Sequence, residues 1–366
     1  MPGMGDRERG RRPYARRSSG GERAASIFSG RPLDRDERVL IALTIGVAAA
    51  IGALLVFISE PRFAAKDFTY PWRAARALLA GLDPYRVIRP TGPYPFESYF
   101  PYPLPAALVG VPFAPLPAAV GGALFFGLSS GALAYALTRD GMGRLWLFCS
   151  PSFAMAAALG QWSPLVMAAA LVAPLGWALA CKPTLGAALF LYRPSWRALW
   201  MGLVFVALSL LILPRWPLEW LEATRHVPHH FAPVLRPFGA LALLALVRWR
   251  APEGRIVAAM SLVPQNLYFY DQLPLWLAAR SGWAGAALTA TSWLAFVAVR
   301  LSCDDPHFCG REAEPWVIAL LYLPAVAIVL FEGRHRPPAD AGATPAGAAL
   351  HERPAAGSVA TVRPEG

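Results

Sequence analysis

Charged residues are scarce in this sequence of 366 residues: Asp, Glu, Lys and Arg make up 16% of it, against 56% hydrophobic residues. The mean hydropathy of +0.40 excludes an ordinary soluble globular domain and favours a membrane protein. Lysine is scarcer still, because Lys66 and Lys182 are the only lysines among many arginines. This bias suggests that these two positions favour a compact ammonium group.

Familiar catalytic motifs are also missing. The sequence has no P-loop, no G-x-G-x-x-G after a strand, no H-E-x-x-H and no G-x-S-x-G, so nucleotide, zinc-protease and serine-hydrolase chemistry lack support. The expected spans contain essentially no Asp or Glu, which counts against an ion-coupled transporter. The net charge of +11 lies mostly in the N-terminus, short loops and C-terminal tail. Topology and anionic lipid headgroups explain this charge better than binding to nucleic acid does.

The first apolar run predicts a membrane span. Val39 to Ile58 is an uncharged stretch of 20 residues, long enough to cross a hydrocarbon layer of ~30 Å. Many arginines precede it, so the positive-inside rule places the N-terminus in the cytoplasm. The run is too long for a removable signal peptide and lacks a cleavage site of small residues.

The whole pattern predicts an all-α polytopic membrane protein with about 10–12 transmembrane helices. We expect disordered cytoplasmic tails at 1–37 and 333–366 and a transmembrane domain at 38–332. The segment "RDGMGR" at 139–144 comes out external by simple alternation of spans, against the charge rule, unless the short segments 104–117 and 164–180 are re-entrant.

The first external loop, 59–103, is long enough to contain amphipathic helices of its own. Thr69 is the expected N-cap and Gly81 the expected C-terminal stop of a short interfacial helix. Asp83, which precedes a proline, is best explained by turn chemistry.

Two ionisable residues at the membrane boundary are candidates for function. Lys182 interrupts an apolar stretch, where an ammonium costs about 2.5–3.5 kcal/mol. It either meets a phosphate or carboxylate or snorkels to the surface. Asp67 follows the first span and would suit a general base that takes a proton from a hydroxyl group. An Asp in a loop is, however, more often a solvated or capping residue.

Four cysteines are present. Cys149 and Cys181 are expected to be buried thiols, since both lie in or near apolar segments. Cys303 and Cys309 share the loop "CDDPHFC", which fits a disulfide in an oxidising space, or a metal site that would also use Asp304 and His307.

Several motifs, taken in order, resemble a known family. These are an Asp after the first span, "ALLAGLDPY", "YFPYPLPAALVGVPFAPLP", "GQWSPL", "CKPTLG", "YRPSWR" and, more weakly, "VPQNLYFYDQLPL". The set resembles the GT-C-fold membrane glycosyltransferases of family 87, which are polyprenyl-phosphate-mannose-dependent mannosyltransferases of bacterial envelope glycolipid synthesis.

The resemblance implies inverting transfer of a sugar, with mannose the expected one, from a polyprenyl-phosphate donor to an external lipid or glycan acceptor, without a metal or other cofactor. It implies a bacterial plasma membrane enzyme with its site on the periplasmic side. Asp67 matches the family's base. The expected donor-binding residues are Tyr102, Gln161, Lys182, Arg73 and His229.

Two other classes of function stay open. A flippase or permease for lipids or polyprenol-linked sugars would share the phosphate-binding cations but need no base. A family member without activity could act as a scaffold for a partner enzyme, with Asp67 dispensable.

Overall fold

The computed structural model describes residues 33–59, 65–91, 94–96, 98–228, 230–303 and 310–334. Residues 1–32, 304–309 and 335–366 lie outside the described residues, so most of the two expected tails and Cys309 are not described. The first helix, α2, spans Arg35–Ser59. It begins with a reciprocal capping box, in which the amide of Glu37 donates to Asp34 Oδ1 and the amide of Asp34 donates to Glu37 Oε2.

The described residues are mostly helical and include one short strand pair, β1 with β2. The first half contains η2 (Lys66–Phe68), α3 (Thr69–Leu79), α4 (Pro84–Val87), β1 (Ile88–Arg89), β2 (Tyr94–Pro95), α5 (Leu104–Gly110), η3 (Val111–Phe113), α6 (Ala118–Leu137), η4 (Thr138–Asp140), η5 (Gly143–Cys149), α7 (Pro151–Ala158), α8 (Ser163–Leu171), η6 (Ala173–Cys181) and α9 (Pro183–Tyr192). The second half contains α10 (Trp196–Ile212), α11 (Trp216–Thr224), η7 (Pro233–Leu235), η8 (Gly239–Arg248), α12 (Pro252–Leu262), η9 (Tyr270–Ala278), α13 (Gly282–Ser302), α14 (Gly310–Val317), η10 (Ile318–Tyr322) and α15 (Leu323–Arg334).

Four helices in the described part are long and apolar enough to cross a membrane, and two bent helix pairs raise the number to six if each pair is one span. The four are Arg35–Ser59, Ala118–Asp140, Gly282–Ser302 and Glu312–Glu332. The expectation of a helical, multi-pass architecture is therefore supported, but the described residues contain fewer helices of membrane-crossing length than the expected 10–12 transmembrane helices. Prolines explain the difference, since Pro112, Pro164 and Pro183 divide the apolar runs into short helices.

α2 and α6 pack antiparallel through glycines. A Cβ on Gly127 would lie 2.6 Å from the Cβ of Ala50, so the helices approach too closely for a larger side chain. At the end of this pair, Arg38 Nη2 donates to the Tyr135 carbonyl at 2.8 Å. Residues 138–144, which follow α6 directly, therefore lie at the same end of the molecule as the N-terminus of α2.

This arrangement puts residues 139–144 at the same end as the N-terminus of α2, as the charge rule expects. α5 contains only seven residues and packs against α3, where a Cβ on Gly110 would lie 2.5 Å from the Pro71 carbonyl oxygen. The segment 104–117 therefore does not form a full span. Other arginine-containing segments gather at the end that holds 139–144, since Arg144 donates to the Ala279 carbonyl and Arg255 to the Tyr192 carbonyl.

The first external loop folds as expected, with one correction. Gly81 adopts a left-handed φ of 71° after α3, and Asp83 caps α4 by accepting from the Tyr85 amide at 2.9 Å. The N-cap of α3 is Phe68 rather than Thr69. The Thr69 hydroxyl accepts from the Ala65 amide instead, because the chain already turns helically at η2.

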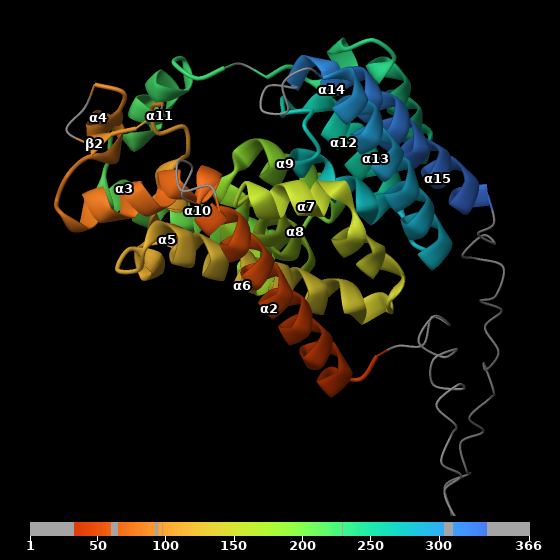
Figure 1. The fold of residues 1–366 in the computed structure, drawn as a ribbon, viewed down its shortest axis with the longest axis horizontal. Helices are drawn as coiled ribbons and strands as arrows, with labels where there is room; N and C mark the ends of the chain where they lie inside the picture. The colour runs from red at the N-terminus through yellow and green to blue at the C-terminus, as the bar shows by residue number, and fades with distance from the viewer. Residues whose placement is uncertain are drawn as a thin grey trace, which may run out of the picture.

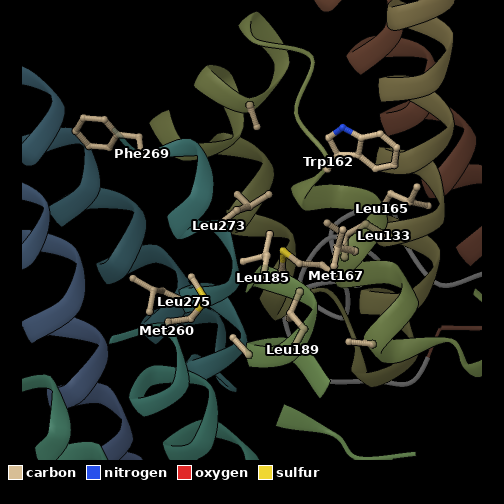
Figure 2. Close-up of a cluster of buried hydrophobic side chains, with 14 of the residues drawn as sticks. Leu133, Trp162, Leu165, Met167, Leu185, Leu189, Met260, Phe269, Leu273 and Leu275 are labelled. Atoms are coloured by element: carbon tan, nitrogen blue, oxygen red, sulfur yellow. The ribbon is translucent and has the colours of Figure 1, made fainter. Parts of the chain in front are cut away.

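A buried core joins the two halves of the chain. Figure 1 shows α12, α13, α14 and α15 as one group beside the group that contains α2, α6, α7 and α8, with α9 between them. Figure 2 shows where the groups meet: Met167 and Leu185 lie close to Leu273, with Met260 on the far side, and all four are buried. Polar side chains from both groups also meet, since Lys182 bonds to Gln161 and to Asp271.

Candidate functional site

Asp67 occupies a constrained turn between α2 and α3. The residue before it, Lys66, has a positive φ of 50°, which is unfavourable for a residue other than glycine. The Asp67 amide donates to the Leu159 carbonyl at 3.0 Å. Phe68 is fully buried and stacks on Phe125 with ring centroids 4.4 Å apart. The turn is therefore fixed on both sides of the carboxylate.

Gln161 reaches Asp67 from a break between two helices. α7 and α8 meet at 117°, and Gly160 forms the turn with a φ of 58°. A Cβ on Gly160 would lie 2.5 Å from the Ala65 carbonyl oxygen, so only glycine lets this turn approach the Asp67 segment. The backbone N–H of Gln161 caps the end of α7 by donating to the Ala156 carbonyl at 2.9 Å.

Five side chains form what we call the polar network: Asp67, Tyr102, Gln161, Lys182 and Asp271. Asp67 Oδ2 accepts from the Tyr102 hydroxyl at 3.3 Å and from Gln161 Nε2. Gln161 Oε1 accepts from Lys182 Nζ at 3.1 Å. Lys182 Nζ also donates to Asp271 Oδ1 at 2.6 Å, forming an ion pair. Only this orientation of the amide gives the carboxylate a donor and the ammonium an acceptor.

The polar network is almost enclosed by apolar residues. Gln161 is fully buried and Asp271 is 6% exposed. The adjoining Trp162 is fully buried too, and its ring centroid lies 4.9 Å from that of Phe125. Burying charges in such surroundings is costly unless they are paired. Here one ammonium pairs directly with Asp271 and is connected to Asp67 through Gln161.

The surroundings of Asp67 change the pKa of its carboxyl group. Burial raises the pKa of Asp67 above its ordinary value of 3.8, while the Lys182 charge and the Gln161 hydrogen bond act in the opposite direction. Asp271 also raises the pKa of Asp67, because it is a second negative charge nearby. A carboxylate with a raised pKa accepts a proton more readily at neutral pH, which is a property of general bases.

Four of the six site residues predicted from the sequence come together in the polar network: Asp67, Tyr102, Gln161 and Lys182. Arg73 does not join them directly; its guanidinium lies 4.4 Å from the Phe96 ring centroid. The described contacts connect it to Tyr102 through Phe96 and Tyr70.

The histidine prediction has a different outcome. His229 lies outside the described residues. Its neighbour His230 is exposed, but surrounding protein displaces water from the imidazole and lowers its pKa. The charges of Asp271, Lys182 and Asp67 all act on His230, so this imidazole lies within electrostatic reach of the polar network.

Asp271 was not predicted from the sequence. It belongs to the stretch "VPQNLYFYDQLPL", in which an acid and three amide side chains interrupt an apolar region. That concentration of polar groups is the signal that identifies it. Hydrogen bonds within the segment hold it together. The backbone N–H of Asn266 donates to Asp271 Oδ2 at 3.2 Å, and Gln272 Nε2 donates to Gln265 Oε1 at 3.0 Å.

No family model, curated protein or solved structure matches this chain.

An apolar groove of about 770 Å³ lies beside the polar network. It is lined by Leu108, Val109, Pro112, Phe113, Phe125, Leu128, Ser129, Ala132, Leu165, Leu175, Trp177, Trp200, Met201, Val204, Phe205 and Leu208. Phe113 and Phe125 form part of its wall and also pack on Phe68, the residue after Asp67. These aromatic contacts connect the groove lining to the Asp67 turn.

The predicted chemistry of the cysteines is partly resolved. Cys149 and Cys181 are free thiols, and Cys181 is buried as expected, whereas Cys149 is exposed. Cys303 is disulfide-bonded, which excludes it as a thiolate metal ligand in this structure. Among the described residues, no group of three His, Cys, Asp or Glu side chains is arranged to hold a metal ion.

Proposed function

We propose that this protein is a membrane glycosyltransferase that moves a sugar from a polyprenyl-phosphate donor to a lipid or glycan acceptor, with Asp67 as general base. The observation that carries the proposal is the pairing of a carboxylate and a cation through Gln161, next to an apolar groove. A hydroxyl acceptor needs a base, a phosphate leaving group needs a cation, and a lipid tail needs apolar surface.

The chemistry follows from this arrangement. The acceptor hydroxyl attacks the anomeric carbon of the donor sugar while Asp67 takes its proton. The bond between the anomeric carbon and the phosphate oxygen breaks, and polyprenyl phosphate leaves with an additional negative charge. Inversion at the anomeric carbon results, because attack and departure occur on opposite faces.

Lys182 is the cation best placed to stabilise the leaving group. An ammonium has three donors, and the described contacts use two of them, to Gln161 and Asp271. In water-poor surroundings, a fixed charge beside the developing phosphate charge contributes more than it would in bulk water. The Tyr102 hydroxyl, which already donates to Asp67, would help to orient the base.

The apolar groove supports a lipid-linked donor over a soluble one. Ser129 is the one hydroxyl-bearing residue in its lining, and its hydroxyl is already used in a bond to the Phe125 carbonyl. Such a surface offers dispersion and desolvation energy to hydrocarbon but no recognition of a nucleotide. The proposal includes a GT-C-like fold and an orientation in a bacterial plasma membrane that places Asp67 on the external side, away from the end that holds Arg38 and residues 138–144.

Transfer by purified protein tests the proposal. The protein is reconstituted in liposomes with mannosyl polyprenyl phosphate that carries a labelled sugar, together with a lipid extract as acceptor. We expect the label to appear in a new glycolipid, identified by mass spectrometry, and polyprenyl phosphate to accumulate in equal amount. Absence of any new glycosidic bond with mannosyl, glucosyl and arabinosyl donors alike would overturn the proposal.

A flippase or permease is the second candidate, and the bent helices favour it. Transport proteins often place their sites where a helix is broken, and Gln161 lies at the 117° break between α7 and α8. The same liposomes decide between the two functions. Movement of labelled donor between leaflets without a new glycosidic bond would support the second candidate.

A further inference from the structure

Asp271 is the least expected member of the polar network, and its position is closely fixed. It is the second residue of η9, after Tyr270. The residue before η9, Phe269, has a positive φ of 67°. The backbone N–H of Asn266 donates to one carboxylate oxygen at 3.2 Å, and the other oxygen accepts from Lys182 Nζ at 2.6 Å. The Tyr270 carbonyl accepts from Ser163 Oγ at 2.8 Å, which attaches this turn to α8.

The contact with Asp271 determines where Lys182 can lie. Lys182 is the residue before α9, and its side chain is 15% exposed. With its ammonium held by Asp271, it presents a donor to Gln161 Oε1, and that bond fixes which end of the Gln161 amide faces Asp67. Asp271 therefore reaches Asp67 through two intervening side chains.

We propose that Asp271 is a positioning residue for the base: by holding the Lys182 ammonium, it fixes the Gln161 amide and keeps the cation from pairing with Asp67. This inference rests on the proposed function of Asp67. It assigns Lys182 to Asp271 between turnovers, so that the Asp67 carboxylate is available to accept a proton.

The charges that face Asp67 agree with this assignment. Lys182 lowers the pKa of Asp67 and Asp271 raises it, in addition to the larger effect of burial. Tyr102 and Tyr270 also face Asp67, and His230 lies within its field. If Asp271 lost its charge, Lys182 would remain as an uncompensated cation near Asp67, and Asp67 would become a weaker base.

A simpler role would be that Asp271 only neutralises a buried lysine. Both roles predict lower stability when Asp271 is replaced, so stability does not separate them. The Asp271 charge also acts on Asp67 directly, so both roles allow the Asp67 titration to change. Only the positioning role predicts that the change depends on Lys182. The measurement must therefore report on the Asp67 carboxyl group.

Infrared titration of the protonated carboxyl band provides that report without relying on activity. The full-length protein in lipid nanodiscs is titrated, and Asp67→Asn identifies the Asp67 signal. In Asp271→Asn we expect the Asp67 midpoint to move to lower pH, and in Lys182→Met to higher pH. In the Lys182→Met background, adding Asp271→Asn should shift the midpoint much less than it does in the wild type.

Glu253→Gln is the matched control. Glu253 is another buried carboxylate in an ion pair, with Arg280 at 3.3 Å, but it lies outside the polar network. Its replacement should leave the Asp67 midpoint unchanged. An Asp67 midpoint that does not move in Asp271→Asn, or that moves equally in both backgrounds, would overturn the proposal.

The outcome is separable from that of the proposed function. If Asp271→Asn does not yield folded protein, Lys182→Met still tests the inference, because an unchanged midpoint would show that the cation does not act on Asp67. If the midpoints shift as expected but the wild type transfers no sugar, the positioning role stands and the glycosyltransferase assignment fails. If the protein is active, Asp271→Asn should move the acid limb of the rate profile to lower pH.

Discussion

The charged form of Asp67 lowers the stability of the fold at neutral pH, because its carboxylate is buried. Burial raises its pKa above 3.8, so the folded protein binds the Asp67 proton more tightly than the unfolded chain does. Stability from this group is fully present below pH 3.8 and is lost as the pH rises through the higher folded value. Residues that reduce stability at neutral pH are common at functional sites, because their environment is selected for chemistry.

The first prediction is that Asp67→Asn stabilises the protein at neutral pH. The amide removes a buried charge but keeps an oxygen that accepts from Gln161. Thermal unfolding in detergent should show a higher Tm for the variant at pH 7, and the difference should shrink as the pH is lowered. A variant less stable than the wild type at every pH would contradict this explanation. Asp83→Asn, which retains a good helix cap, is the control.

The Lys182–Asp271 pair gives the second prediction. Lys182→Met leaves Asp271 buried beside an apolar side chain, which should cost about 3–5 kcal/mol of unfolding free energy. Adding Asp271→Asn should recover a large part of that loss, since it removes the unpaired charge. Reversible unfolding in mixed micelles measures both.

The control for that pair is an ion pair at the surface. Arg225 and Glu222 are 75% and 59% exposed in their side chains, so Arg225→Met should cost at most ~1 kcal/mol. Equal losses at the two sites would show that burial of the Lys182 pair is unimportant.

At the scale of elements, short helices and tight turns bring the site residues together. The Gly160 turn joins α7 and α8 and also touches the segment that carries Asp67. Gly81 has a similar positive φ after α3, but nothing lies within 4 Å of a Cβ placed there. The two glycines share the same backbone conformation and differ only in crowding.

The third prediction uses this pair. Gly81→Ala should cost about 1–2 kcal/mol for the left-handed conformation and leave activity unchanged. Gly160→Ala adds a collision with the Ala65 carbonyl and displaces Asp67 from Gln161, so turnover should fall by about 10²-fold. Stability and turnover are measured for both variants. If the two alanines have the same effect on turnover, the close approach at Gly160 is irrelevant to the site.

At the scale of the whole molecule, the N-terminus of α2 and the polar network lie at different ends of the helices. The end with Arg38 includes the segment that follows α6, whereas Asp67 follows the opposite end of α2. The charge rule assigns the first end to the cytoplasm.

The fourth prediction tests that topology. In a Cys149→Ser background, Leu82→Cys should react with a membrane-impermeant maleimide on intact spheroplasts, because Leu82 is exposed and follows α3, the helix that begins two residues after Asp67. Arg139→Cys and Arg197→Cys, both at exposed positions, should react only after the membrane is permeabilised. Labelling of all three in intact spheroplasts would contradict the orientation.

The sequence predicted the helical membrane architecture and four members of the polar network, and the reasons for its failures are physical. Asp67 and Lys182 stood out because charges at a membrane boundary are costly. The number of transmembrane helices was overestimated, because several apolar runs form helices too short to cross a membrane. Asp271 was missed because its partner lies 89 positions away in the chain, and only folding joins them. The resemblance to glycosyltransferase family 87 stays a prediction.

The fifth prediction is the most direct test of the central claim, that Asp67 is the base of a sugar transfer reaction. Single-turnover transfer from mannosyl polyprenyl phosphate is followed for the wild type, Asp67→Asn and Asp83→Asn, with the donor Kd measured separately. We expect Asp67→Asn to lower the transfer rate by about 10²–10⁴-fold with little change in Kd, and Asp83→Asn to match the wild type. Full transfer by Asp67→Asn would contradict the account.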